Sequence, residues 1–407
     1  MNIGIVTTWF ERGAAYVSKQ FRDELIKENN VYIYARGGEE YAINDPNWNN
    51  EWVTWGKKVL FGVPTQIDLK DFEKWIHKNK LDIIFFNEQH WWEIILFCNK
   101  MKIKIGAYID FYTERTIPFF QCYDFLICNT KKHYETFKWH PNVYYIPWGT
   151  DIDLFKPSSF LPVDKEIITF FHSCGYSPER KGTDLLIKAF SSIDNKKSKL
   201  IIHSQFSIED AYPELKEEIA ILKEEHRLCI YEKTVSSPGL YDLGDIYVYP
   251  TRLEGIGLTI AEALSCGLPV ITSDNAPMNE FIDNTNGRCI KVNKLYSRED
   301  GYYWPLCEVD INDLLENMNW YINRYDQISE LKRQARVYAE RNLNWSVNSK
   351  KINVIFREVH TKRFTNKSLI TNSVRNFEEN RESFSYKIHK KSPLLLKILK
   401  YIYKFIK

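Results

Sequence analysis

Residues 250–272 read PTRLEGIGLTIAEALSCGLPVIT, and the fold can be inferred outward from this stretch. The preceding residues 245–249 (DIYVY) are mainly apolar and end at a proline, which predicts a short buried strand. Residues 258–266 place their apolar side chains on one face at the helical period, and Gly267 is typical of a helix end. Residues 268–272 predict a second apolar strand. Together these segments predict a βαβ unit.

The turn inside this unit carries residues suited to a phosphate. Gly255 and Gly257 bracket the predicted helix start, where backbone can approach a ligand and free N–H groups carry the positive end of the helix dipole. Glu254 and Glu262 flank the turn, and a carboxylate can accept from two neighbouring hydroxyls. This spacing suits a ligand with a diphosphate centre and a sugar ring at either end. An ordinary strand–helix junction with a solvated glutamate face is the alternative.

The complete string resembles the signature of retaining glycosyltransferases of family 4. It reads R-x-E-G-x-G-L-x-x-x-E-A-x-x-x-G-x-P-V, with seven residues between Glu254 and Glu262. The resemblance implies the GT-B fold, an α/β architecture of two Rossmann-like domains facing a central cleft. It also implies that Glu262 binds the ribose of a nucleotide-sugar donor, while Glu254 and the amides of Ile256, Gly257 and Leu258 hold the donor sugar and phosphates.

Composition allows two domains and excludes several classes of protein. The chain has 407 residues, of which 44% are hydrophobic, enough for two ordinary cores. Its eight cysteines form no C-x-x-C pair, so neither a zinc site nor a redox motif is indicated, and reduced thiols in a cytoplasmic protein are expected. The first residues predict a strand rather than a signal peptide, and no run approaches 18 apolar residues.

The predicted domains follow the alternation of strands and helices. We expect an N-terminal acceptor domain over 1–150, a nucleotide-sugar domain over 151–345, a crossover helix over 346–360, and a basic linker with an amphipathic helix over 361–407. Residues 144–157 resemble the family's segment that crosses between the domains.

The first predicted loop contains a glycine of interest. Residues 2–8 predict a strand and 18–28 a helix, so 9–15 form a loop at the carboxyl end of a strand, where open α/β sheets bind ligands. Gly13 resembles the family's first-loop glycine, which lies close to the donor phosphates. A plain turn is the alternative.

Polar residues also follow other predicted strands of the first half. Many family members carry a histidine near the end of the strand that corresponds to 103–109, whereas this chain has Asp110 there. His90, just after the preceding strand, is the candidate replacement. We take Asp110 and His90 as candidate catalytic residues, with an ordinary surface loop as the alternative.

A second phosphate-binding motif is predicted at the start of the second half. Gly175-x5-Lys181-Gly resembles a family motif in which the lysine contacts the donor diphosphate. The arginine that normally follows the first glycine is replaced by Tyr176, and Arg180 is the candidate for the missing cation. A solvated Arg-Lys pair is the alternative, although cations disfavour a helix start. Further along, residues 208–225 predict a single charged helix.

No metal or other cofactor is expected. Asp151-x-Asp153 has the spacing of a metal-binding DxD motif, but it lies in the predicted linker, and the GT-B resemblance implies no metal.

The last 47 residues are strongly basic. Residues 361–407 hold 12 Lys+Arg and 3 acidic residues. On a helical wheel Lys397, Lys400, Lys404 and Lys407 lie within about 80°. Residues 387–407 therefore predict an in-plane helix on an anionic membrane surface, which would place the protein at the inner face of the membrane. A helix docked on the protein's own surface is the alternative.

The family resemblance, together with the residues that carry it, implies a retaining glycosyltransferase. The donor would be a UDP- or GDP-sugar, and the acceptor a hydroxyl of a lipid-linked or cell-surface glycan. The alternatives are a nucleotide-sugar epimerase or phosphorylase on the same fold, and a non-catalytic partner subunit. Nucleic-acid binding is not expected, because the chain without its basic tail is acidic.

Overall fold

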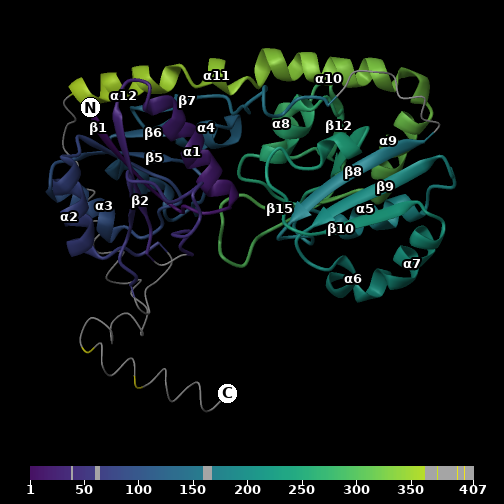
Figure 1. The fold of residues 1–407 in the computed structure, drawn as a ribbon, viewed down its shortest axis with the longest axis horizontal. Coiled ribbons are helices and arrows are strands. Elements are labelled where there is room, and N and C mark those ends of the chain that lie inside the picture. Colours follow the sequence, from purple (N-terminus) through teal and green to yellow (C-terminus); the bar gives the residue numbers. More distant parts are fainter. Residues whose placement is uncertain are drawn as a thin grey trace. The chain divides into compact units, whose positions relative to one another are not determined.

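The computed structural model describes residues 1–37, 40–59, 65–158 and 167–362, and the single residues Val374, Ser392 and Ile398 (Figure 1). The chain divides into two compact units. The first comprises Met1–Cys128, His133–Ile146 and the described part of Ser349–Lys407; the second comprises Asn129–Lys132 and Pro147–Asn348. Apart from the single residues Ser392 and Ile398, the predicted membrane-surface helix over 387–407 lies outside the described residues.

The first unit is built on a sheet of seven parallel strands in the order β3-β2-β1-β4-β5-β6-β7. Its central strands are buried on both faces, which explains their nearly continuous apolar sequences. The strands are β1 (Asn2–Thr7), β2 (Asn30–Ala35), β3 (Val53–Trp55), β4 (Ile83–Phe86), β5 (Lys104–Tyr108), β6 (Phe125–Cys128) and β7 (Val143–Tyr145).

Helices that connect these strands are joined by one from the far end of the described chain. The ring of Phe356, in α12, packs against Phe85 and Phe125 of the sheet at centroid distances of 5.6 and 5.1 Å. Asn353 of α12 also donates a hydrogen bond to the backbone oxygen of Glu24 at 2.9 Å. The helices are α1 (Gly13–Leu25), α2 (Leu69–Asn79), α3 (Glu93–Lys100), the 3-10 helix η1 (Ile117–Cys122), α4 (Lys131–Phe137, whose first two residues lie in the second unit) and α12 (Lys351–Thr361).

The second unit repeats this plan with six parallel strands in the order β10-β9-β8-β11-β12-β13 and a separate antiparallel pair, β14 and β15. Its main strands are β8 (Ile168–Gly175), β9 (Ser198–Ser204), β10 (Leu228–Glu232), β11 (Ile246–Tyr249), β12 (Val270–Ser273) and β13 (Gly287–Ile290). The pair consists of β14 (Val292–Tyr296) and β15 (Leu306–Val309).

The helices of the second unit follow its strands along the chain. They are α5 (Thr183–Ser191), α6 (Ile208–Ala211), α7 (Lys216–Glu224), α8 (Leu258–Ser265), α9 (Ile311–Ile322), α10 (Ile328–Asn342) and α11 (Trp345–Asn348), with 3-10 helices η2 (Pro213–Leu215), η3 (Tyr241–Leu243), η4 (Met278–Phe281) and η5 (Tyr325–Gln327). The core includes Phe170, Leu186, Leu200, Val248 and Leu314, all fully buried.

Both sheets have the strand order of a Rossmann-type fold. In each, the order of strands along the sheet reverses between two central neighbours, β1 and β4 in the first unit and β8 and β11 in the second. Open parallel sheets bind ligands beyond the carboxyl ends of the strands at such a switch point. The predicted α/β fold class is confirmed, and the topology points to the loops that follow these four strands.

Two of the expected elements are wrong. Helix α1 begins at Gly13 rather than at residue 18, because Arg12 is extended and its carbonyl accepts from the N–H groups of Ala15 and Tyr16. Gly13 is therefore the first residue of a helix and not part of a loop. The helix expected over 208–225 is broken into α6, η2 and α7 at Pro213, since proline has no N–H for the helical hydrogen bond.

Candidate functional site

The candidate site lies at the switch point of the second unit. Strand β8 ends at Gly175 and β11 ends at Tyr249, and the two strands pair directly. The loops that follow them, 176–182 and 250–257, therefore leave the same edge of the sheet side by side. These loops contain most of the predicted donor-binding residues.

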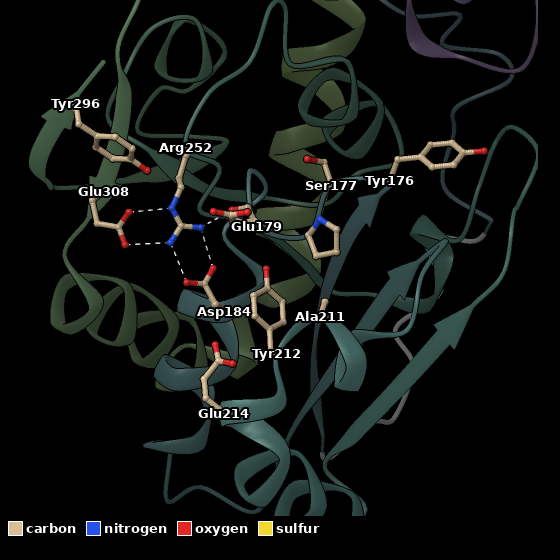
Figure 2. A pocket seen from close by; sticks show the side chains of 11 residues that line it. Tyr176, Ser177, Glu179, Asp184, Ala211, Tyr212, Glu214, Arg252, Tyr296 and Glu308 are labelled. Atoms are coloured by element: carbon tan, nitrogen blue, oxygen red, sulfur yellow. Dashed lines mark hydrogen bonds and ion pairs between the residues drawn. The ribbon is translucent and has the colours of Figure 1, made fainter. Parts of the chain in front are cut away.

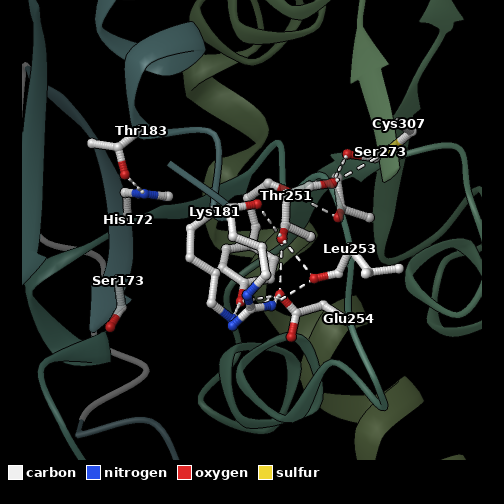
Figure 3. A network of polar contacts seen from close by, with 12 residues as sticks. His172, Ser173, Lys181, Thr183, Thr251, Leu253, Glu254, Ser273 and Cys307 are labelled. Carbon is white, nitrogen blue, oxygen red and sulfur yellow. Dashed lines mark hydrogen bonds and ion pairs between the residues drawn. The ribbon is translucent and has the colours of Figure 1, made fainter. Parts of the chain in front are cut away.

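The centre of the site is one oxygen of Glu254. Its Oε1 accepts hydrogen bonds from Arg180 Nη1 at 2.8 Å, Lys181 Nζ at 2.7 Å, Tyr249 OH at 2.9 Å and Thr251 Oγ1 at 2.8 Å (Figure 3). Only 9% of the Glu254 side chain and 12% of the Lys181 side chain are exposed. The structure thus brings three of the predicted residues together with two that the sequence analysis missed.

The charges in this network control one another's titration. Burial alone would raise the pKa of Glu254, but the Arg180 and Lys181 cations and its hydrogen bonds lower it to about 2. Burial and the neighbouring Arg180 lower the pKa of Lys181 to about 8, although Glu254 opposes this shift. At neutral pH the glutamate is ionised and most of the lysine is protonated. The site therefore presents a preformed ion cluster.

The start of α8 is suited to an anion. Gly257, the N-cap residue, precedes the helix with φ +96°, a conformation that favours glycine, and it has no side chain that could cap the helix. Among the described residues, a Cβ built on Gly255 would meet no atom within 4 Å, so there is space beside this part of the turn. The amides of Ile256, Gly257 and Leu258 are consequently suited to hold phosphate oxygens.

Glu262 lies within α8 beyond this turn. Its Oε2 accepts a hydrogen bond of 2.5 Å from the hydroxyl of Tyr241 in η3. Burial raises the pKa of Glu262, whereas the Tyr241 hydroxyl opposes the rise. Tyr241 orients this carboxylate.

The second cation of the Glu254 network is Arg180, and not the residue that directly follows Gly175. Gly175 closes β8 with φ +53°, and the next residue, Tyr176, points outward, is 65% exposed and packs against Phe206 at a ring distance of 5.5 Å. The position where the family has arginine therefore does not contribute to the Glu254 network. Arg180 does, and it also donates to the carbonyl of Leu253 at 2.6 Å.

His172 connects the elements that flank the two loops. It is fully buried in β8, where its Nδ1 lies 2.8 Å from the carbonyl oxygen of Val248 and its Nε2 lies 2.8 Å from Thr183 Oγ1 (Figure 3). Burial lowers the pKa of His172 to about 4, so the ring is neutral at pH 7. The side chain ties β8 to β11 and to the first residue of α5.

The remaining predicted residues lie in the first unit. Asp110 follows β5 and His90 follows β4; the His90 ring lies 4.9 Å from that of Phe111, the neighbour of Asp110. Burial, reinforced by the charge of Glu88, raises the pKa of Asp110. Gly13 begins α1 in the same unit. Asp110 and His90 thus share one edge of the first sheet, separate in the chain from the Glu254 network.

Sequence analysis missed Tyr249, Thr251, Tyr241 and His172. Tyr249 is the last residue of a strand beside the switch point, and this position could have marked it as a site residue. The sequence contains no comparable signal for the others, because their roles depend on how side chains from separate segments meet. Among the described residues, no group of three His, Cys, Asp or Glu side chains is arranged to hold a metal ion.

Comparison with known proteins gives a family match within the second unit. Residues 166–297 match the profile of the family described as Glycosyl transferases group 1. The second unit carries a glycosyl transferases group 1 domain. Both loops of the Glu254 network fall within this group 1 domain.

Two curated relatives are glycosyltransferases. An uncharacterized glycosyltransferase of Sulfolobus islandicus rod-shaped virus 1 is 26% identical over 40% of this chain and 51% of its own, so the chain spans about half the length of that relative. The lipopolysaccharide core biosynthesis mannosyltransferase LpsB of Rhizobium meliloti is 35% identical over 17% of this chain and 20% of its own.

Solved structures resemble nearly the whole chain. A glycosyltransferase from Rickettsia africae superimposes with a TM-score of 0.71 at 15% identity, covering 89% of this chain and 99% of that one. HepE from Anabaena, in complex with UDP and glucose, gives 0.66 at 17% identity and covers 88% and 100%. At these identities the likeness shows the fold. The expected pair of Rossmann-like units, as in GT-B glycosyltransferases, is confirmed.

Proposed function

We propose that the protein is a retaining glycosyltransferase that moves a sugar from a UDP- or GDP-sugar to a hydroxyl group of a glycan. The observation that carries this proposal is the convergence of Arg180 and Lys181 on Glu254 at the start of α8 in the group 1 domain. Two cations and a helix N-terminus are suited to a diphosphate, and the flanking carboxylates are suited to sugar hydroxyls.

The donor's diphosphate would lie against the α8 amides, with Lys181 and Arg180 beside it. Lys181 would then share its ammonium between Glu254 and a phosphate oxygen, and Arg180 would supply the second positive charge. Glu262, oriented by Tyr241, would accept from the ribose hydroxyls, and Glu254 would accept from a hydroxyl of the donor sugar. Gly13 and Gly175 remain candidates for the close approach of backbone to the donor.

In the transfer, the bond between the anomeric carbon and the diphosphate oxygen breaks, and a bond to the acceptor oxygen forms on the same face. The acceptor proton passes to the leaving phosphate. Lys181 and Arg180 would stabilise the negative charge that develops on the diphosphate, so positioning and electrostatics supply the catalysis. Asp110 and His90 are proposed to act on the acceptor side, and no metal is proposed.

A glycan acceptor is supported by the name of the Rhizobium relative, a lipopolysaccharide core mannosyltransferase, and by an O-antigen chain mannosyltransferase of Escherichia coli that is 44% identical over 11% of this chain and 12% of its own. The UDP bound to HepE supports uridine as the base. In the described part of the chain, no helix has the length and apolar character needed to cross a membrane. We propose that the acceptor is a lipid-linked or cell-surface glycan. We also propose that the protein acts in the cytoplasm at the inner face of the membrane, which it binds through residues 387–407.

A thermal-shift panel tests the donor site. UDP, GDP, ADP and common nucleotide sugars are added to the wild type and to Glu262→Ala. A ligand at about 100 times its Kd stabilises the folded state by roughly 2.7 kcal/mol, enough to raise Tm visibly. We expect one nucleotide to stabilise the wild type and not the variant, which would also identify the base. If none of these ligands raises the Tm of the wild type, the proposal is contradicted and a non-catalytic subunit is favoured.

A further inference from the structure

A cavity of about 590 Å³ lies in the second unit next to the donor loops (Figure 2). It is formed by the loop after β8, the first turn of α5, the α6–η2 corner and the β14–β15 pair, and its lining includes four carboxylates and three tyrosines. The lining residues used below are Tyr176, Glu179, Asp184, Tyr212, Glu214, Arg252, Tyr296 and Glu308.

The only cation among the lining residues is already committed to two carboxylates. Arg252 donates to both oxygens of Asp184, each at 2.8 Å, and to both oxygens of Glu308 at 2.8 and 3.0 Å. These three groups together carry one negative charge. Glu179 and Glu214 are exposed and form no ion pair within the described residues, so each adds a further negative charge. The cavity lining therefore has a net charge of about −3 at neutral pH.

A buried hydroxyl in the wall points independently to a ligand. Tyr212 is only 6% exposed, and its OH has no hydrogen-bond partner among the residues that the structure describes. In Figure 2 the hydroxyl end of the Tyr212 side chain points toward the middle of the lining residues, between Asp184 and Ser177. A buried polar group without a partner costs free energy, and nearly all such groups in native proteins are paired. A ligand in this cavity would supply the missing partner.

We propose that this cavity binds a polyamine, a flexible aliphatic chain that carries several ammonium groups. Ammonium groups would donate to the carboxylates of Glu179 and Glu214 and to the hydroxyl oxygen of Tyr212. The methylene segments would pack on the ring of Tyr296, which is also suited to cation–π contact. An anion would be repelled, and a neutral sugar would leave the negative charge uncompensated. The volume is ordinary for a small-molecule site.

This site adjoins the proposed donor site without sharing its side chains. Tyr176 and Glu179 belong to the same loop as Arg180 and Lys181, and Arg252 precedes Glu254 by two residues. The polyamine site does not depend on the chain being a transferase, because its charge and its hydroxyl are present in the second unit whatever reaction the chain performs.

Isothermal titration of the full chain with spermidine tests the proposal. The variants are the double substitution Glu179→Gln/Glu214→Gln, and Tyr212→Phe, which removes only the hydroxyl. Glu217→Gln, an exposed carboxylate of α7 that does not line the cavity, is the matched control. Maltotriose is titrated in parallel as a neutral glycan. Thermal melting of each variant verifies that it is folded.

We expect saturable spermidine binding to the wild type and the control. The double variant should bind at least about tenfold more weakly and Tyr212→Phe about three- to tenfold more weakly, because each loses contacts to a charged group. Absence of spermidine binding to the wild type, or equal affinity in the double variant and the control, would overturn the proposal. Binding of maltotriose that Tyr212→Phe weakens would assign the cavity to a glycan instead.

Discussion

One oxygen atom, Oε1 of Glu254, accepts hydrogen bonds from four side chains contributed by two loops and the end of a strand. Without this carboxylate, Arg180 and Lys181 would be two neighbouring cations in a largely buried site. Without the cations, the buried carboxylate would be uncompensated. The cluster therefore holds the loops in position. It also keeps the two cations, Arg180 and Lys181, where they could bind a diphosphate.

Removing either side of this cluster should impair transfer. We expect Glu254→Ala and Lys181→Ala each to lower turnover at least about tenfold, which corresponds to about 1.4 kcal/mol of transition-state stabilisation. The measurement is the steady-state rate at saturating donor, with thermal melting of both variants to verify folding. Glu217→Gln serves as the control for a remote carboxylate. Rates near that of the wild type in both variants would show that the reaction takes place elsewhere.

The pH dependence should report Lys181. Its pKa of about 8 means that the ammonium loses its proton as the pH rises through 8, and with it the attraction to the diphosphate. We therefore expect kcat/KM to be high below pH 8 and to fall above it, since kcat/KM reports groups of the free enzyme. Lys181→Arg should move this alkaline limb to higher pH, whatever its effect on the maximal rate. A limb that stays in place in the variant would contradict the assignment.

At the scale of elements, the site depends on strands β8 and β11 being neighbours. Their pairing sets the two loops side by side, and His172 ties the end of β11 to the start of α5 through Val248 and Thr183. Ser273, at the end of the neighbouring strand β12, donates to the carbonyl of Thr251 at 2.7 Å and steadies the second loop. These contacts make the loop positions a property of the sheet.

The buried His172 should make stability depend on pH. Its pKa is about 4 in the folded protein and about 6.5 in the unfolded chain, so the unfolded chain binds more protons between these values. This contribution is fully present above about pH 6.5 and is lost as the pH falls toward 4. Between pH 7 and pH 5 the loss amounts to about 2 kcal/mol.

Urea unfolding of the wild type and His172→Asn at pH 7 and pH 5 measures this contribution. The asparagine removes the titrating group, so the variant should be less stable at pH 7 but should lose about 2 kcal/mol less than the wild type between the two pH values. An equal loss in both proteins would mean that His172 is not the group responsible.

At the scale of the whole molecule, the chain combines two Rossmann-like units with a basic C-terminal segment. The folded units account for the proposed donor chemistry. The segment after residue 361 accounts for the proposed location, because its lysines suit anionic lipid.

Deletion of residues 387–407 should abolish co-sedimentation with liposomes that contain anionic lipid. Each lysine near such a surface contributes about 1 kcal/mol, so replacing Lys397, Lys400, Lys404 and Lys407 by glutamine should weaken binding by about 4 kcal/mol. Neutral liposomes serve as the control. Unchanged sedimentation of the deleted protein would leave the tail without a membrane role.

Much of the fold was predictable from sequence, because strands and helices leave local patterns. The glycines and glutamates of residues 254–262 and the Arg180–Lys181 pair were located in the same way, by a motif on a predicted turn. The start of α1 was missed. It is set by the extended backbone of Arg12, whose carbonyl accepts two N–H groups, and these backbone features produce no pattern of apolar residues in the sequence. Pro213 itself indicated a helix break. It was overlooked because the charged helical pattern continues on both sides of it.

The sequence alone determined the βαβ unit around residues 250–272 and its glycine-containing turn, because apolar spacing and glycine act over a few residues. Only the tertiary structure decided that Arg180, Lys181, Tyr249 and Thr251 meet at one oxygen of Glu254, and that Tyr212 turns its hydroxyl into an acidic cavity. These contacts join segments up to 74 positions apart. Strand order and pairing bring such segments together, and a sequence pattern that spans one turn carries no information about them.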